Sequence, residues 1–347
     1  MRGAKSGTGR MNSGAFMGGN NILGAVFALI SFAIFATHDV VVKYLGGHYS
    51  AIQIIFFSVV LGFPLVMVML IRDRSDGNLR PRHPWWTTVR TAAAVVTGVT
   101  AFYAFSVLPL AQTYAILFAT PLLITLLAIP ILGEKVGIRR GIAVVVGLLG
   151  VMIVLRPGDA DLSLGHAAAL TAAVCASLAS VIVRKIGADE RAAVLLLYPM
   201  LANFVVLGAA LPLVYKPMPI EHLGMMGIIA LFGFIAMLFI IGAYRRAEAV
   251  VVAPMQYSQM IWAAIYGALI FDESLDLYTI LGATIIIASG IYIVLREGRK
   301  ASSSNSPVLR TQVRPETGHL PRLSSLMGIG GRHADPRNRR DEAEDGA

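Results

Sequence analysis

Apolar residues occur along the chain in ten runs, each separated from the next by a short polar segment. A helix needs about 20 apolar residues to cross the ~30 Å hydrocarbon core of a bilayer. The pattern therefore predicts an all-α, polytopic membrane protein with ten transmembrane helices. The expected helices cover residues 22–45, 50–71, 88–108, 112–132, 141–155, 164–184, 192–214, 223–243, 250–271 and 278–295.

One sequence unit of about 140 residues occurs twice. Residues 108–157 correspond to 247–297, and, further upstream, residues 24–46 align without a gap on 165–187. Residues of like charge occupy equivalent positions in the two copies: Glu134 matches Glu273, Arg156 matches Arg296, and Lys43 matches Arg184. A repeat of this kind has to be recognised before any other prediction of the fold. We therefore expect a duplicated bundle with an even number of helices.

The duplication divides the chain into four parts. We expect a cytoplasmic leader at 1–20, a first five-helix repeat at 21–157, a second repeat at 158–297 and a tail at 298–347. The tail is rich in Ser, Pro and charged residues, a composition that buries no core and predicts disorder. The single cysteine, Cys175, has no partner for an intramolecular disulfide.

Five helices per repeat form an odd number, so the second repeat must enter the membrane upside down relative to the first. Inverted repeats are typical of secondary transporters, whose two related halves exchange conformations to open a central site to either side. Duplication can also simply build a stable bundle. We expect transport.

The distribution of charge supports this membrane topology. Only 14% of the residues are charged, 56% are hydrophobic, and the net charge is +9. Thirteen Lys and Arg residues fall in the alternate loops 72–90, 134–140, 184–191 and 244–249. Basic loops stay in the cytoplasm, which predicts a bacterial-type inner membrane protein with both termini inside. The positive net charge thus reflects the membrane topology, and we expect no nucleic-acid partner.

Several short motifs, in this order and at these spacings, resemble the EamA branch of the drug/metabolite transporter superfamily over about residues 22–297. They lie at 39–45, 108–111, 121, 132–137, 253–257, 271–273, 281–283 and 289–292. The resemblance implies a solute cavity between the halves, lined mainly by helices other than the fifth and tenth. Relatives often carry an Arg after paired aromatics in helix 2, where this chain has Ser58 after Phe56 and Phe57. An anionic substrate is therefore less expected.

Ionisable residues inside a bilayer are functional candidates, because an unpaired charge there costs several kcal/mol. His38, Asp39 and Lys43 fall near the end of the first helix. Asp39 is a candidate proton or cation site and His38 a candidate substrate contact. Positions 38 and 39 point about 100° apart on a helix, whereas Asp39 and Lys43, four residues apart, can form an ion pair. The alternative is that Lys43 reaches the headgroups with Asp39 as its partner.

The ninth expected helix begins with a polar cluster. Gln256, Gln259, Ala263 and Tyr266 share one helical face, and Tyr257 and Trp262 flank it. Glutamine is costly against lipid, so this face is expected to point into the protein, either to a cavity or to a neighbouring helix. The prolines Pro121 and Pro254 free backbone carbonyls and are candidate hinges.

Aromatic residues on the third and fourth expected helices offer flat surfaces for an organic solute. The candidates are Tyr103, Tyr114 and Phe118, and the isolated polar residue Asn203 joins them. Each can equally serve helix packing. Three further residues receive structural interpretations: Glu134 and Glu273 begin the next helix, where a carboxylate favours the dipole, and Arg184 marks the inner face.

Small residues in the fifth and tenth helices predict close helix packing. They are Gly141, Gly147, Gly150, Gly282, Ala283 and Gly290. No motif for a hydrolase, a metalloprotease or a phosphate loop is present, and we expect neither an enzyme nor a metal or other cofactor.

The sequence therefore predicts a carrier that moves a small organic metabolite by alternating access, with its substrate between the expected helices 22–45, 88–108, 112–132, 223–243 and 250–271. A neutral or zwitterionic aromatic metabolite such as riboflavin is the first hypothesis. An amino acid, a nucleoside and S-adenosylmethionine remain open, as do efflux of drugs and a non-transporting receptor or scaffold. The expected partners are the solute and the bilayer, and a homodimer is left open.

Overall fold

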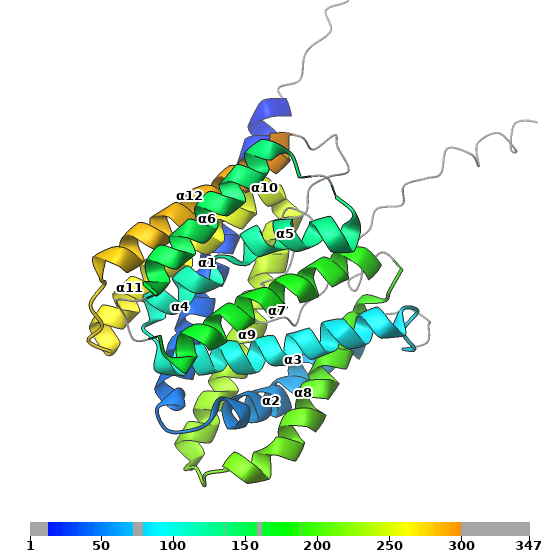
Figure 1. Ribbon diagram of the computed structural model, residues 1–347. Coiled ribbons are helices and arrows are strands. Elements are labelled where there is room, and N and C mark those ends of the chain that lie inside the picture. The colour runs from blue at the N-terminus through cyan, green and yellow to red at the C-terminus, as the bar shows by residue number, and fades with distance from the viewer. Residues whose placement is uncertain (1–12, 72–78, 135, 158–161, 188, 300–347) are drawn as a thin grey trace, which may run out of the picture.

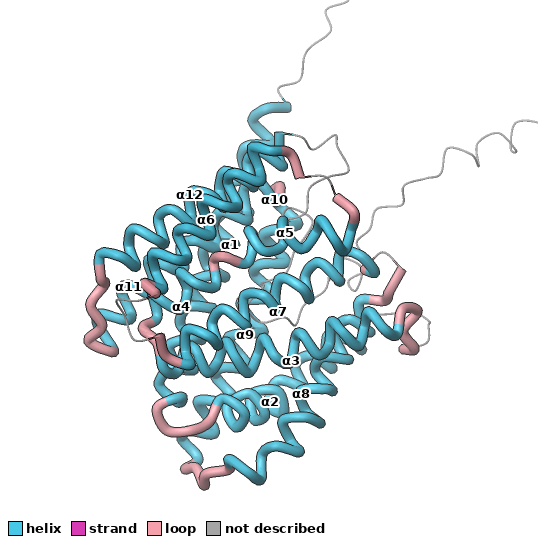
Figure 2. Tube along the Cα trace, viewed as in Figure 1, coloured by secondary structure: helices cyan, strands magenta, loops and turns pink. Residues whose placement is uncertain are grey.

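The structure is a computed structural model that describes residues 13–71, 79–134, 136–157, 162–187 and 189–299. Those residues form helices and loops without a strand (Figures 1 and 2). The helices are α1 Ser13–Gly46, α2 Ala51–Ile71, α3 Pro84–Val107, α4 Leu110–Leu117, α5 Thr120–Leu132, α6 Ile138–Leu155, α7 Leu164–Ile186, α8 Ala192–Val214, α9 Ile220–Arg246, α10 Ala249–Val252, the 3₁₀ helix η1 Ala253–Tyr257, α11 Ser258–Ile270 and α12 Leu277–Arg299. The expected leader falls mostly, and the expected tail almost entirely, outside the described residues.

The prediction of an all-α polytopic membrane protein is confirmed. Within the described residues, nine helical segments are long and apolar enough to span a membrane, with α4 and α5 together forming one of them. The remaining crossing, the ninth expected helix at 250–271, is present as α10, η1 and α11, and its interruption keeps it from forming one long helix. The start of α1 and the end of α12 lie at the same end of the bundle (Figure 1).

The fourth crossing was expected to be continuous and is broken at Phe118 and Ala119. Pro121 is the physical reason, because it has no N–H to donate to the carbonyl of Leu117. The hydroxyl of Thr120 donates to that carbonyl instead, at 2.6 Å. The carbonyl that Pro121 leaves without its helical partner is therefore hydrogen-bonded at the break between α4 and α5.

The ninth crossing was also expected to be continuous, and it contains the 3₁₀ helix η1 over Ala253–Tyr257. Pro254 is the second residue of this segment. A 3₁₀ helix turns 120° per residue instead of 100°, so the face that we expected to run from Gln256 to Tyr266 does not continue through it. Both breaks lie beside the prolines predicted as hinges.

The helices of the two halves of the chain pack mainly against one another. Helix α1 runs along α9, α3 along α7, and α2 against α8 and α9. Helices α6 and α12 form a separate pair at one edge of the bundle (Figure 1). The two halves are thus interlocked throughout.

Glycines allow the close contact between α6 and α12, as predicted. A Cβ on Gly282 would lie 2.6 Å from the carbonyl oxygen of Gly150 and 2.5 Å from a methyl group of Val154. Gly290 instead receives the Tyr257 side chain from the ninth crossing, and Gly141 faces open space. Three of the predicted packing glycines, Gly147, Gly150 and Gly282, therefore lie at tight helix contacts.

The glycine pair Gly282 and Gly141 provides a matched test of this packing. We expect Gly282→Ala to destabilise the protein by about 1–3 kcal/mol, because the added methyl overpacks against backbone. Gly141→Ala should be neutral or slightly stabilising, because alanine favours the helix and meets nothing. Thermal melts of both variants in the same detergent check this, and equal melting temperatures would contradict it.

Candidate functional site

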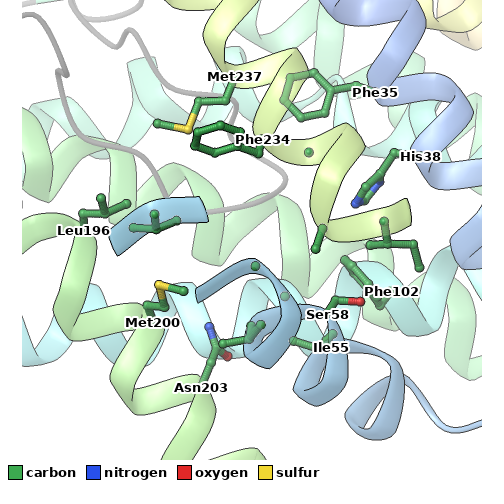
Figure 3. A pocket seen from close by; sticks show the side chains of 17 residues that line it. Phe35, His38, Ile55, Ser58, Phe102, Leu196, Met200, Asn203, Phe234 and Met237 are labelled. Carbon is green, nitrogen blue, oxygen red and sulfur yellow. The ribbon is translucent and has the colours of Figure 1, made fainter. Parts of the chain in front are cut away.

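A cavity lies between α1, α2, α3, α8 and α9 (Figure 3). It contains about 970 Å³ of atom-free space, its open mouth included. Glycines on three of these helices, Gly62, Gly98 and Gly233, contribute no side chains and so leave room. The other lining residues are Phe35, His38, Ile55, Ser58, Val59, Val66, Phe102, Leu196, Met200, Asn203, Ile229, Ala230, Phe234 and Met237.

Three polar side chains interrupt the apolar wall of the cavity. Asn203 is fully buried, and both atoms of its amide lack a hydrogen-bond partner among the described residues. The Ser58 hydroxyl is likewise buried without a partner in the described part of the chain. Buried polar groups are normally paired, so these atoms are candidate ligand contacts. His38 supplies the third polar group.

His38 connects the cavity to a buried carboxylate. Its Nδ1 lies 2.7 Å from Oδ1 of Asp39, while the ring faces the cavity (Figure 3) and meets the ring of Phe102 edge-on. The expectation that adjacent helical positions diverge was wrong for these two residues. The rotamers of the two side chains bring their polar ends together, although the two positions are adjacent on the helix.

Asp39 is 2% exposed and belongs to a chain of polar groups from three crossings. The Tyr114 hydroxyl of α4 donates a hydrogen bond to Oδ2 of Asp39. The Gln259 amide of α11 donates to the Tyr114 oxygen at 3.3 Å. A carboxylate buried in a membrane protein needs such donors, and it can also take up a proton. The chain therefore joins the candidate substrate contact His38 to a candidate proton site.

The ion pair that we expected between Asp39 and Lys43 is not formed. Lys43 Nζ instead lies 2.7 Å from Oε1 of Glu273, in the loop between α11 and α12, and also donates to the Leu108 carbonyl. The other carboxylate oxygen of Glu273 accepts from the N–H of Leu110, the first residue of α4. Glu273 thus stabilises the start of α4, and not that of its own following helix as predicted.

A second ion pair is formed by the residues that match Lys43 and Glu273 in the other copy of the repeat. Arg184 at the end of α7 pairs with Glu134 after α5, so it does more than mark a face. Since Lys43 matches Arg184 and Glu273 matches Glu134 in the repeat, the two pairs are equivalent, and each joins one half to the other. They lie at opposite ends of the α4–α5 crossing.

Further polar contacts join the loops at the Lys43 end. Gln53 and Lys216 exchange two hydrogen bonds between the start of α2 and the segment after α8, at 2.8 and 2.9 Å. Tyr49 Oη lies 2.7 Å from Nδ1 of His222 in α9. These contacts join the start of α2 to the segment after α8, and the loop after α1 to α9. All four of these helices line the cavity.

Asp276, in the same loop as Glu273, begins α12. Its carboxylate accepts hydrogen bonds from Tyr278 and Thr279 and lies 3.1 Å from Arg156. Burial raises the pKa of Asp276, but the hydrogen bonds from Thr279 and Tyr278 and the charge of Arg156 outweigh it, so the pKa lies below its ordinary value of 3.8. Asp276 is thus a charged helix cap.

The remaining predicted site residues lie outside the cavity lining. Tyr103 is 37% exposed on the outer face of α3. Phe118 is fully buried between Tyr114 and Tyr257, with ring centroids 5.9 and 5.1 Å away. Gln256 is half-buried in η1. Trp262, also half-buried, stacks on Tyr266, whose hydroxyl lies 3.0 Å from that of Thr37 in α1.

Helix α2 supplies a part of the lining that was not among the predicted site residues. Ile55, Ser58, Val59, Gly62 and Val66 lie in the cavity, and their spacing of three, four and seven residues marks one helical face. That face could have been recognised by its only polar member, Ser58. Helices α2 and α8 line this cavity and α4 and α11 do not, so its lining differs from the set of helices that we expected around the substrate.

An all-helical membrane bundle of ten crossings with an internal cavity and a buried carboxylate has the architecture of a solute carrier. The EamA-like transporter family model matches the chain twice, over residues 22–156 and 163–296. The chain belongs to this family, and it is a transporter and not an enzyme.

Curated relatives agree with this assignment. The chain is 25% identical over 284 residues to an S-adenosylmethionine uptake transporter of Rickettsia prowazekii, covering 81% of this chain and 96% of the relative. It is 24% identical over 273 residues to the pseudopaline exporter CntI of Pseudomonas aeruginosa, covering 77% and 94%. An uncharacterized transporter of Helicobacter pylori is 23% identical over 299 residues, covering 80% and 96%.

A double-mutant cycle tests the ion pair between the halves. We expect Lys43→Met and Glu273→Gln to show a coupling free energy of about 0.5–3 kcal/mol in thermal or denaturant unfolding, because each removes the partner of a mostly buried charge. The control cycle combines Lys43→Met with Glu134→Gln at the opposite end, and its effects should add within about 0.5 kcal/mol. Equal coupling in both cycles would contradict the pairing.

Proposed function

We propose that the protein is an inner-membrane secondary transporter that moves a neutral, zwitterionic or singly cationic organic metabolite through the cavity between α1, α2, α3, α8 and α9. The buried polar atoms of Asn203 and Ser58 in an otherwise apolar cavity carry this proposal. Leaving a buried polar group unpaired costs about 1–3 kcal/mol, and a bound solute would remove that cost. The basic loops favour an orientation with both termini in the cytoplasm.

The substrate class follows from the cavity wall. The Asn203 amide offers a donor and an acceptor side by side, the arrangement that pairs with the amino edge of an adenine ring. Phe35, Phe102 and Phe234 supply aromatic surfaces for a flat or positively charged group. The relative named for S-adenosylmethionine uptake makes that metabolite the first candidate. No relative named above points to riboflavin, which becomes one compound of the test panel beside a nucleoside and an amino acid.

His38 and Asp39 are the proposed proton coupling pair. The His38 ring lies in the cavity wall and also contacts the Asp39 carboxyl. Substrate binding in the cavity would therefore change the surroundings of His38, the residue that contacts this carboxyl. A proton on Asp39 removes a buried charge, and its presence would favour one state of the carrier. The breaks at Pro121 and Pro254 are the proposed hinges.

Purified protein in vesicles tests coupling and substrate together. We expect S-adenosylmethionine, of the four panel compounds, to accumulate against its gradient when a pH gradient is imposed. Asp39→Asn should lower this accumulation at least about tenfold, because an amide cannot exchange a proton. It should keep exchange of labelled for unlabelled substrate, since binding in the cavity does not need the proton.

Glu221→Gln serves as the matched control, because Glu221 is an exposed carboxylate in the first turn of α9. It should leave both accumulation and exchange unchanged. Undiminished accumulation in Asp39→Asn would remove Asp39 from coupling while leaving the transport function standing. Saturable binding without flux of any panel compound in the wild-type protein would favour a receptor.

A further inference from the structure

A groove runs along the surface between α6 and α12, neither of which lines the cavity. It contains about 620 Å³ of atom-free space, its open side included. Small residues, Ala143, Ala288 and Ser289, line it where the helices approach, and the exposed apolar side chains of Ile142 and Val146 flank them. Most of the groove is therefore apolar and opens toward the lipid.

One end of the groove is basic. The exposed Arg139 lines it, and Arg296 donates from Nη1 to the hydroxyl of the lining residue Tyr292 at 3.2 Å. Within the part of the chain that the structure describes, neither arginine has a carboxylate within ion-pair distance. Each arginine is seven residues from a residue of the apolar part, Arg139 from Val146 and Arg296 from Ser289. Seven residues correspond to about 10 Å along a helix.

We propose that this groove binds one anionic phospholipid, with an acyl chain along the apolar part and the phosphate between Arg139 and Arg296. A groove that is apolar toward the bilayer centre and basic at its end matches the two parts of such a lipid. The planar guanidinium group pairs well with phosphate oxygens, and basic pockets between transmembrane helices bind anionic headgroups.

The same charges disfavour a second copy of the chain as the occupant. In a dimer with a two-fold axis along the membrane normal through this face, residues at equal depth approach one another. Arg139 and Arg296 of each copy would then face their equivalents, and the groove offers no carboxylate from the described residues to separate them. Burial of like charges without partners is unfavourable, whereas a lipid phosphate neutralises them.

The test uses the full-length protein in a neutral detergent, with phosphatidylglycerol or phosphatidylcholine of identical acyl chains added. Native mass spectrometry should show one phosphatidylglycerol retained by the wild-type protein, and thermal melts should rise with that lipid only. We expect the double variant Arg139→Gln with Arg296→Gln to lower retention about tenfold, because it removes two charge-assisted contacts.

Arg245→Gln is the matched control, since Arg245 is exposed in the last turn of α9, outside the groove. It should retain the lipid as the wild type does, and melts without lipid show that the variants fold. Equal retention of the two lipids, unchanged retention in the double variant, or the same rise in melting temperature with inorganic phosphate alone would overturn the proposal. So would lipid-independent disulfide dimers through Ile142→Cys in a Cys175→Ser background.

Discussion

Burial of the Asp39 carboxyl inside the bundle is the constraint on which the rest of the site depends. In a membrane interior an ionisable group is costly unless its neighbours bond it, and here His38 and Tyr114 lie against its two oxygens. Tyr114 in turn accepts from Gln259. Because these residues come from α1, α4 and α11, three crossings must converge at one point, and their convergence sets where the His38 ring meets the cavity.

Charged residues nearer the ends of the bundle also need a bonded partner where they are buried. Lys43 and Arg184 occupy matching positions of the repeat and are each paired with a glutamate of the other half. One duplicated arrangement therefore fastens the halves together at both ends, while the α4–α5 and α10–α11 crossings are interrupted between them. In the proposed transport cycle, the broken crossings and the cavity wall are the regions that rearrange, and α6 and α12 are a closely packed pair beside them.

Much of the fold could be predicted because hydropathy, loop charge and the repeat all constrain it independently. The details of the site depend on information that a linear pattern lacks. The partner of Lys43 is 230 residues away, so the nearer Asp39 was the wrong choice. His38 and Asp39 meet through side-chain rotamers, which helical angles alone do not give. Residues such as Phe35 and Met237 line the cavity, yet they are indistinguishable in sequence from apolar residues that face lipid.

For the two prolines, Pro121 and Pro254, the sequence indicates where a helix is perturbed, and the structure shows the form of the perturbation. Pro121 and Pro254 indicated where the helices would be perturbed, but only the structure shows a turn after α4 in one repeat and a 3₁₀ segment in the other. Thr120 satisfies the carbonyl that Pro121 frees. The matching crossings of the two repeats are thus both interrupted beside a proline, but by different local geometry.

Substrate protection of a single cysteine in the cavity is the sharpest test of whether the substrate passes through it. Ser58→Cys in a Cys175→Ser background places the only thiol of the protein in the cavity wall. We predict that a membrane-impermeant maleimide labels this thiol from either side of the membrane during transport, and that the transported substrate slows the labelling from both sides. Transport by this variant with labelling that substrate leaves unchanged would contradict it.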